Sequence, residues 1–124
     1  MKEIKFRGKT VDNGKWIYGY LQKADYGLAI SEDVSKTPYL YVDDKTIGQY
    51  TNLKDKNGVE IYEGDILRNY GNDIEDWIVS YEDGKFVGTI DNVYEDLYEN
   101  SDFEVIGSIY DELKDSDIKW VVKR

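Results

Sequence analysis

Three Asn-Gly or Asp-Gly dipeptides constrain the fold of this chain more than any other feature of its sequence. They are Asn13-Gly14, Asn57-Gly58 and Asp83-Gly84, and each precedes a segment rich in aromatic and β-branched residues. Asn, Asp and Gly tolerate the positive φ angles that tight hairpin turns require. The dipeptides therefore predict three β-hairpins, and the clearest of them joins residues 77–82 to residues 85–90.

The composition between the turns also favours strands over helices. The chain of 124 residues contains twelve Tyr, three Trp, three Phe, eleven Gly and one Pro. Aromatic and β-branched residues suit a pleated, half-buried surface, and Gly marks tight turns. The segment 16–21 is apolar at alternate and intervening positions, which predicts a central strand covered on both faces with a bulge or bend at Gly19.

Helix signals are confined to the C-terminal third. Asn92 and Glu95 have the spacing of a capping box, and the following apolar stripe predicts a short helix over residues 93–99. A second helical turn is expected over residues 110–114, a strand over 103–109 and a final strand over 118–123. We expect a single domain over residues 1–124 of mainly β class (β-rich α+β): an antiparallel, barrel-like sheet built from hairpins, with one or two short helices.

Several function classes lose support from residues that the chain lacks. It has no Cys and no His, which removes disulfides, thiolate nucleophiles, imidazole bases and the usual structural zinc sites. It also lacks a P-loop motif and a G-x-G-x-x-G run. We therefore expect a protein that is not an enzyme and that uses no cofactor or metal.

The charge pattern argues against ordinary nucleic-acid binding. The formal net charge is −10, with ten acids against one Lys in residues 91–117, while residues 1–15 and 118–124 are basic. Phosphate backbones repel an acidic surface unless the basic termini converge. The acidic segment is expected to be a solvated surface, and the sharper alternative is a carboxylate array that mimics DNA and inhibits a host DNA-binding protein. No apolar stretch is long enough for a membrane span or signal peptide, so we expect no membrane association and a cytoplasmic location in a bacterial host.

Two acidic motifs invite a binding-site interpretation. The run 55–60 resembles a calcium loop, but its Gly comes at the fourth position instead of the sixth, so a hairpin turn is favoured. Asp65, after Glu63-Gly64, could serve as an acid, a base or a metal ligand. The favoured interpretation is that Gly64 allows the chain to turn and Asp65 caps backbone N–H groups of the corner.

The aromatic residues leave two alternatives open. A stacking platform for single-stranded nucleic acid would pair them with basic residues, whereas the neighbours of Tyr39, Tyr41, Tyr50, Trp77 and Tyr81 are as often acidic. Packing in the core and in protein interfaces is the favoured use.

Four segments, taken in order, resemble the YopX-like family of phage and prophage proteins. They are residues 4–9 with 13–20, residues 47–58, residues 61–66 and residues 103–110, and together they span nearly the whole chain. The resemblance implies a β-rich protein without an established biochemical activity, so no catalytic residue can be transferred. It also implies that a family-wide role lies in the block around residues 47–67.

We therefore expect an accessory protein that binds an unknown protein partner or a second copy of itself. The alternative is a nucleic-acid-associated module that uses the basic termini. The expected interaction surface consists of the polar and aromatic residues of the block: Gln49, Tyr50, Thr51, Lys54, Asp55, Tyr62 and Asp65.

Overall fold

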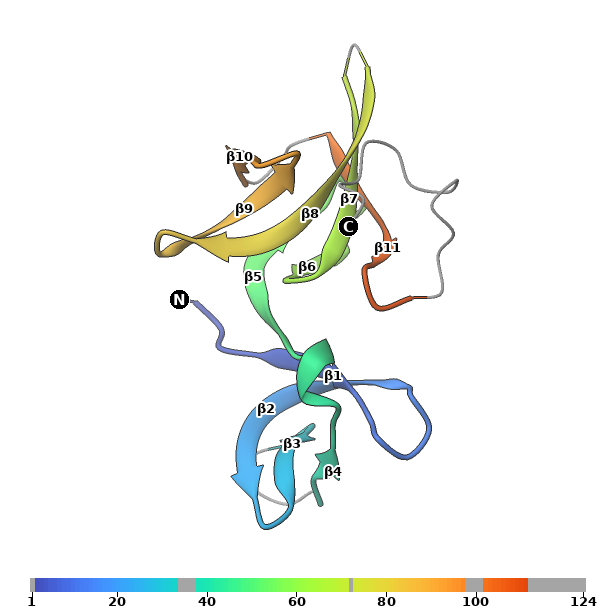
Figure 1. The fold of residues 1–124 in the computed structure, drawn as a ribbon, viewed down its shortest axis with the longest axis vertical. Coiled ribbons are helices and arrows are strands. Elements are labelled where there is room, and N and C mark those ends of the chain that lie inside the picture. The colour runs from blue at the N-terminus through green and yellow to red at the C-terminus, as the bar shows by residue number, and fades with distance from the viewer. Residues whose placement is uncertain (1, 34–37, 72, 98–101, 112–124) are drawn as a thin grey trace. The chain divides into compact units, whose positions relative to one another are not determined.

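A computed structural model describes residues 2–33, 38–71, 73–97 and 102–111 (Figure 1). The chain divides into two compact units, Met1–Tyr50 and Thr51–Arg124, called unit 1 and unit 2 below. Both are built from antiparallel strands, and the one described helix is a single 3-10 turn. None of the described helical residues forms a segment long and apolar enough to cross a membrane.

Unit 1 is a meander of short strands. It comprises β1 (Phe6–Lys9), β2 (Trp16–Ala24), β3 (Gly27–Ser31), β4 (Leu40–Tyr41), the 3-10 helix η1 (Asp44–Thr46) and the start of β5 (Gly48–Lys54). The strand order is β4-β3-β2-β1-β5, because the chain returns after η1 and places β5 beside β1. One face is apolar and forms the core of the unit: Phe6, Ile17, Leu21, Leu28, Ile30, Val42 and Ile47.

The central strand of unit 1 is β2, which pairs with β1 on one side and β3 on the other. Its position confirms the predicted central strand, but its predicted coverage on both faces is wrong. Ile17 and Gly19 are buried, whereas Tyr18 and Tyr20 are 43% and 45% exposed. Gly19 has φ +154°, and a Cβ there would lie 2.1 Å from the carbonyl oxygen of Ser31. Gly19 is therefore required by a close backbone approach.

Unit 2 contains the end of β5, the short strand β6 (Glu60–Tyr62) and a second sheet. That sheet is formed by β7 (Asp65–Tyr70), β8 (Ile74–Glu82), β9 (Lys85–Ile90), β10 (Val93–Asp96) and β11 (Phe103–Ser108). The strand order is β10-β9-β8-β7-β11, so the chain crosses over to put β11 against β7. The core consists of Ile61, Leu67, Trp77, Val79, Ile90 and Phe103, with Leu53, Leu97 and Val105 packed against it.

The turn predictions hold at all three dipeptides. Asp83 and Gly84 both have positive φ and connect Glu82 to its partner Lys85, as a two-residue type I′ turn does. Gly58 has positive φ, and its N–H donates a hydrogen bond to the carbonyl oxygen of Asp55, which closes the turn. Gly14 also has positive φ, in a longer loop between β1 and β2.

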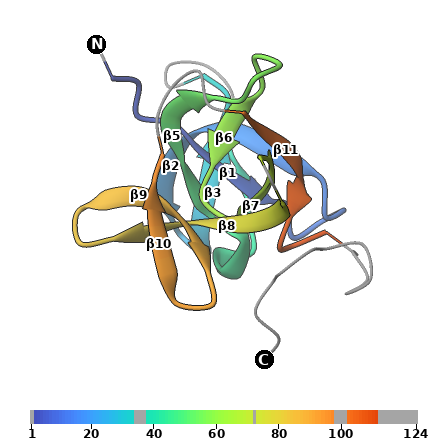
Figure 2. The ribbon, with the colours of Figure 1, turned by 90° about the horizontal axis from the view of Figure 1, so that it is seen from above.

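The predicted helix over residues 93–99 is wrong over residues 93–97, the part of it that the structure describes. Asp91 and Asn92 have φ values of 46° and 65°, so they form a two-residue turn, and β10 follows as a strand paired with β9 (Figure 2). The apolar spacing after Asn92 resembles a helical stripe. Asp91 and Asn92, however, tolerate left-handed φ angles and form the turn of a hairpin. The predicted helical turn over 110–114 extends beyond the described residues, and the predicted strand over 118–123 lies outside them.

The predicted fold class is correct in its coarse form. The chain is mainly β with two antiparallel sheets, and the predicted strand over 103–109 corresponds to β11. The described strands do not close into a barrel, so the barrel-like prediction is wrong. Hairpin signals specify pairs of neighbouring strands, but closure depends on pairings between distant strands, which turn chemistry does not encode.

Candidate functional site

The residues predicted as an interaction surface fall in both units, and most of them are buried. Gln49 and Tyr50 belong to unit 1, and the other five belong to unit 2. Lys54 is exposed and Gln49 is half-buried. The remaining five have at most 7% of their surface exposed: Tyr50, Thr51, Asp55, Tyr62 and Asp65.

Asp55 holds a loop against a distant strand. Its Oδ1 accepts hydrogen bonds from the backbone N–H groups of Asn57 (2.8 Å) and Val59 (2.9 Å). Its Oδ2 accepts one from the backbone N–H of Val105 in β11 (2.9 Å), fifty residues away in the sequence. The carboxylate therefore organises the β5–β6 turn and fixes it to β11.

Asp65 forms the predicted corner. Its Oδ2 accepts a hydrogen bond of 2.7 Å from the backbone N–H of Tyr62, and Gly64 has φ +88°. The Gly64 N–H donates to the carbonyl oxygen of Val79, which ties the corner to β8. The capping role predicted for Asp65 is confirmed. The Thr51 side chain also has a structural role, because its hydroxyl donates a hydrogen bond to the carbonyl oxygen of Ile61 (2.8 Å).

In unit 1, three cations in β1 or directly before it lie on aromatic rings of neighbouring strands. Lys5 Nζ lies 5.0 Å from the centre of the Tyr50 ring. The Arg7 guanidinium carbon lies 4.3 Å from the centre of the Trp16 ring, and Lys9 Nζ lies 5.4 Å from it. These distances are typical of cation–π contacts, so these cations and rings partly satisfy one another within the unit.

Unit 1 also presents tyrosines on the face opposite its core. Tyr18 and Tyr20 alternate with buried residues along β2, and strand register places Tyr41 of β4, Ala29 of β3 and Gln22 of β2 on one face of the sheet. Side chains two residues apart on a strand share a face, so Gln22 continues the row of Tyr18 and Tyr20. Tyrosines of β2 and β4 consequently lie on the same side of the sheet.

The end of that row is an exposed cluster, called the tyrosine patch, formed by Tyr26, Tyr39 and Tyr41. Tyr26 is 90% exposed and Tyr39 38%. The Tyr41 ring centre lies 6.2 Å from that of Tyr26 and 5.5 Å from that of Tyr39, with the latter pair edge to face. The three rings thus lie close together at the surface.

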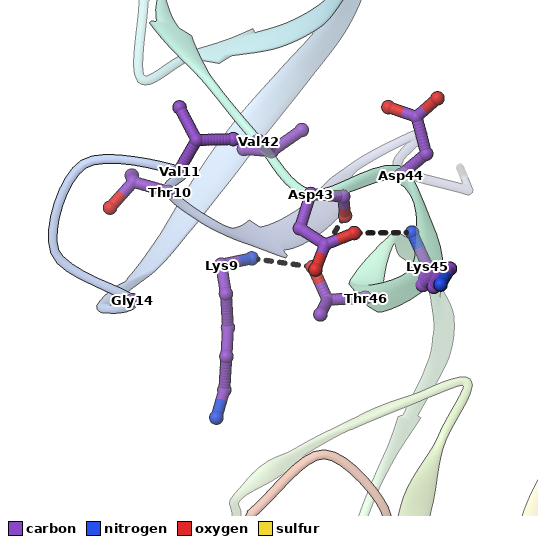
Figure 3. A pocket seen from close by; sticks show the side chains of 9 residues that line it. All are labelled: Lys9, Thr10, Val11, Gly14, Val42, Asp43, Asp44, Lys45 and Thr46. Carbon is purple, nitrogen blue, oxygen red and sulfur yellow. Dashed lines mark hydrogen bonds between the residues drawn. The ribbon is translucent and has the colours of Figure 1, made fainter.

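A shallow depression of about 650 Å³ lies between the β1–β2 loop and η1 (Figure 3). Its polar groups are used internally: the Lys9 N–H donates to Thr46 Oγ1, the Thr46 hydroxyl donates to the carbonyl oxygen of Asp43, and the Lys45 N–H donates to Asp43 Oδ1. Figure 3 shows that these hydrogen bonds connect Lys9 of β1 to η1 and to Asp43 directly before it. The depression is open, and its arrangement is explained by the attachment of η1 to β1.

Unit 2 places charged and aromatic groups together near its sheet. Glu104 accepts hydrogen bonds from the Tyr70 hydroxyl (2.7 Å) and from Asn57 Nδ2 (3.0 Å), and these bonds lower the pKa of its carboxyl group. Arg68 makes two bonds to the buried carboxylate of Asp76, and the pair raises the pKa of the guanidinium. Among the described residues, no three Asp or Glu side chains are placed to hold a metal ion.

Sequence reasoning missed the tyrosine patch because its members come from two separate segments. Tyr26 lies in the β2–β3 turn, whereas Tyr39 precedes β4 and Tyr41 lies within it. The sequence offers Tyr39 and Tyr41 as candidates for a stacking platform, but their link to Tyr26 depends on the β3–β4 pairing. The exposed Asp25-Tyr26-Gly27 turn is the one local signal that could have suggested it.

The family assignment follows from comparison with known proteins. Residues 5–114 match the family described as YopX protein. The chain belongs to the YopX family. The predicted resemblance is therefore confirmed.

A solved structure has a similar fold over most of its length. The crystal structure of protein EF1440 from Enterococcus faecalis is 28% identical in sequence, with a TM-score of 0.55, and the alignment covers 88% of this chain and 94% of that one. A search of curated proteins gave no match. The comparisons thus identify the family and a structure of similar fold. They identify no reaction and no ligand.

Proposed function

We propose that this YopX protein is a non-enzymatic accessory module that binds a protein partner, or a second copy of itself, through the exposed tyrosines of unit 1. The single observation that carries the proposal is the row of tyrosines on the face opposite the unit 1 core. Tyr18 and Tyr20 are more than 40% exposed although the strand that bears them is central in its sheet.

Tyrosine suits this role for a physical reason. Its ring buries a large apolar area with few rotatable bonds, and its hydroxyl keeps a polar contact in the interface. An exposed row of such rings on a rigid strand loses little conformational entropy on binding. The proposal therefore moves the expected contact surface from the buried residues of the 47–67 block to the exposed tyrosines of unit 1.

The nucleic-acid alternative receives less support from the same unit. Arg7 is 6% exposed and lies on Trp16, and Lys5 forms an ion pair with Glu3 at 3.7 Å as well as its contact with Tyr50. Cations engaged in this way are poorly placed to neutralise phosphates.

The DNA-mimic alternative concerns unit 2, whose sequence carries nineteen acids against eight bases.

The test is a pull-down from a nuclease-treated lysate of a bacterial host, combined with a measurement of molar mass in solution. We expect a stoichiometric protein partner or a dimer with the wild-type chain, and its loss in the Tyr18→Ala/Tyr20→Ala double variant. The matched control is Tyr81→Ala, because Tyr81 is 53% exposed and belongs to unit 2. A wild-type monomer without a partner would refute the proposal, and capture that is sensitive to added DNA would favour the DNA-mimic alternative.

A further inference from the structure

The aromatic rings of unit 1 fall into two groups with different surroundings. The rings of Trp16 on β2 and Tyr50 on β5 are contacted by cations of the chain itself. In the tyrosine patch, the ring contacts are with other tyrosines, and no cation of the described residues lies over Tyr26, Tyr39 or Tyr41. The patch therefore offers aromatic faces that can accept a cation from another molecule.

The charge around the patch favours a basic partner. Residues 24–46, which contain all three patch tyrosines, carry five acids against two lysines, whereas residues 1–23 carry six bases against two acids. Asp25 is adjacent to Tyr26 in sequence and is exposed. Its charge also helps to raise the pKa of the Tyr39 hydroxyl, after the stronger effect of the hydrogen bond with Tyr41. A carboxylate thus lies within electrostatic range of the rings.

We propose that the tyrosine patch binds an extended peptide segment that bears arginine, with the guanidinium stacked on the tyrosine rings and paired with Asp25. Arginine is favoured over lysine because its planar, weakly hydrated guanidinium stacks on rings and pairs with carboxylates in a fork.

This inference rests on the proposed function and adds the chemistry of the partner. It is tested by fluorescence polarisation with two labelled peptides, one of repeated Pro-Pro-Arg and one of repeated Pro-Pro-Gln. Proline keeps both probes extended, so they differ in the cation alone. We expect the arginine peptide to bind at least about tenfold more tightly, since tenfold in affinity corresponds to one desolvated cation–π contact.

The variants locate the site. We expect Tyr26→Ala/Tyr39→Ala to weaken binding of the arginine peptide about tenfold and Asp25→Asn to weaken it about threefold, with Tyr81→Ala unchanged. Both patch tyrosines lie outside the apolar core of unit 1, and an unchanged circular dichroism spectrum shows that the variants are folded. NMR amide shifts on peptide addition should be confined to residues 24–31 and 38–43.

Three results would overturn the inference. They are equal binding of the two peptides, arginine-peptide binding that persists in the tyrosine double variant, and failure of both peptides to bind. If both peptides fail while a lysate partner is still lost in Tyr18→Ala/Tyr20→Ala, the proposed function stands and only this inference fails. If a labelled single-stranded oligonucleotide bound more tightly than the arginine peptide, and Tyr26→Ala/Tyr39→Ala abolished that binding, the ligand of the patch would be nucleic acid and not a peptide.

Discussion

Replacing Asp55 by Ala should cost this protein a large share of the stability of unit 2. The carboxylate is 7% exposed and accepts three backbone N–H bonds, from Asn57, Val59 and Val105. A hydrogen bond to a charged group contributes about 1.5–3 kcal/mol, so the three bonds together contribute at most about 9 kcal/mol. Asn57 and Val59 are exposed, so their N–H groups regain water in the variant, while Val105 is half-buried.

We therefore expect Asp55→Ala to lower the free energy of unfolding by about 2–4 kcal/mol. At roughly 4 °C per kcal/mol for a chain of this size, the melting temperature should fall by about 8–16 °C. Asp55→Asn keeps the volume and one acceptor but loses the charge, so it should cost about half as much.

The assay is urea unfolding followed by circular dichroism, together with amide hydrogen exchange. The exchange of the Val105 N–H should accelerate in Asp55→Ala more than that of strands distant from the loop, because its acceptor is lost. The matched control is Asp73→Ala, an exposed acid of the same unit, which should change stability by less than about 0.5 kcal/mol. If Asp55→Ala and Asp73→Ala were equally mild, Asp55 would not clamp the loop to β11.

Three further outcomes follow from the structure. Gly64→Ala should lower the melting temperature more than Gly58→Ala: both positions have positive φ, but a Cβ at 64 would lie 2.9 Å from a tyrosine ring carbon and one at 58 meets nothing within 4 Å; equal shifts would contradict this. Tyr70→Phe should raise the pKa of Glu104 in an NMR titration. Because that pKa is lowered in the folded state, the stability it contributes is present above the ordinary glutamate pKa and is lost as the pH falls through the folded value, so the variant should lose less stability on acidification. Tyr50→Ala should destabilise the fold by about 3–5 kcal/mol, as expected for a buried aromatic residue, and a stable variant that only loses a partner would contradict its burial.

The turns were predictable from sequence wherever the chemistry is local. Gly58 and Gly84 have positive φ, as the dipeptides predict, because few residues other than Gly tolerate those angles without strain. The same chemistry operates at Asp91 and Asn92, yet the helical spacing of the residues after them favoured the wrong element. A short apolar stripe does not distinguish a helix from an exposed edge strand such as β10, because a few apolar residues fit either periodicity.

The candidate site was less predictable because exposure depends on distant pairings. Tyr50 and Tyr62 have the residue type of an interface but are 5% and 2% exposed, while Tyr18 and Tyr20, expected to be covered, are exposed. Asp65 was predictable as a corner residue because its partner, the Tyr62 N–H, is three residues away. The contact between Asp55 and Val105 spans fifty residues and has no local signal.

The most direct test of the central claim is quantitative capture of the partner by matched tyrosine variants. With immobilised wild-type protein, Tyr18→Ala/Tyr20→Ala and Tyr81→Ala, the amount of stoichiometric protein retained from nuclease-treated lysate, or of self-associated chain, is measured by mass spectrometry and light scattering. The account predicts that wild-type and Tyr81→Ala retain equal amounts and that the double variant retains about tenfold less. Equal retention by all three proteins would show that the exposed tyrosines of unit 1 are not the binding surface.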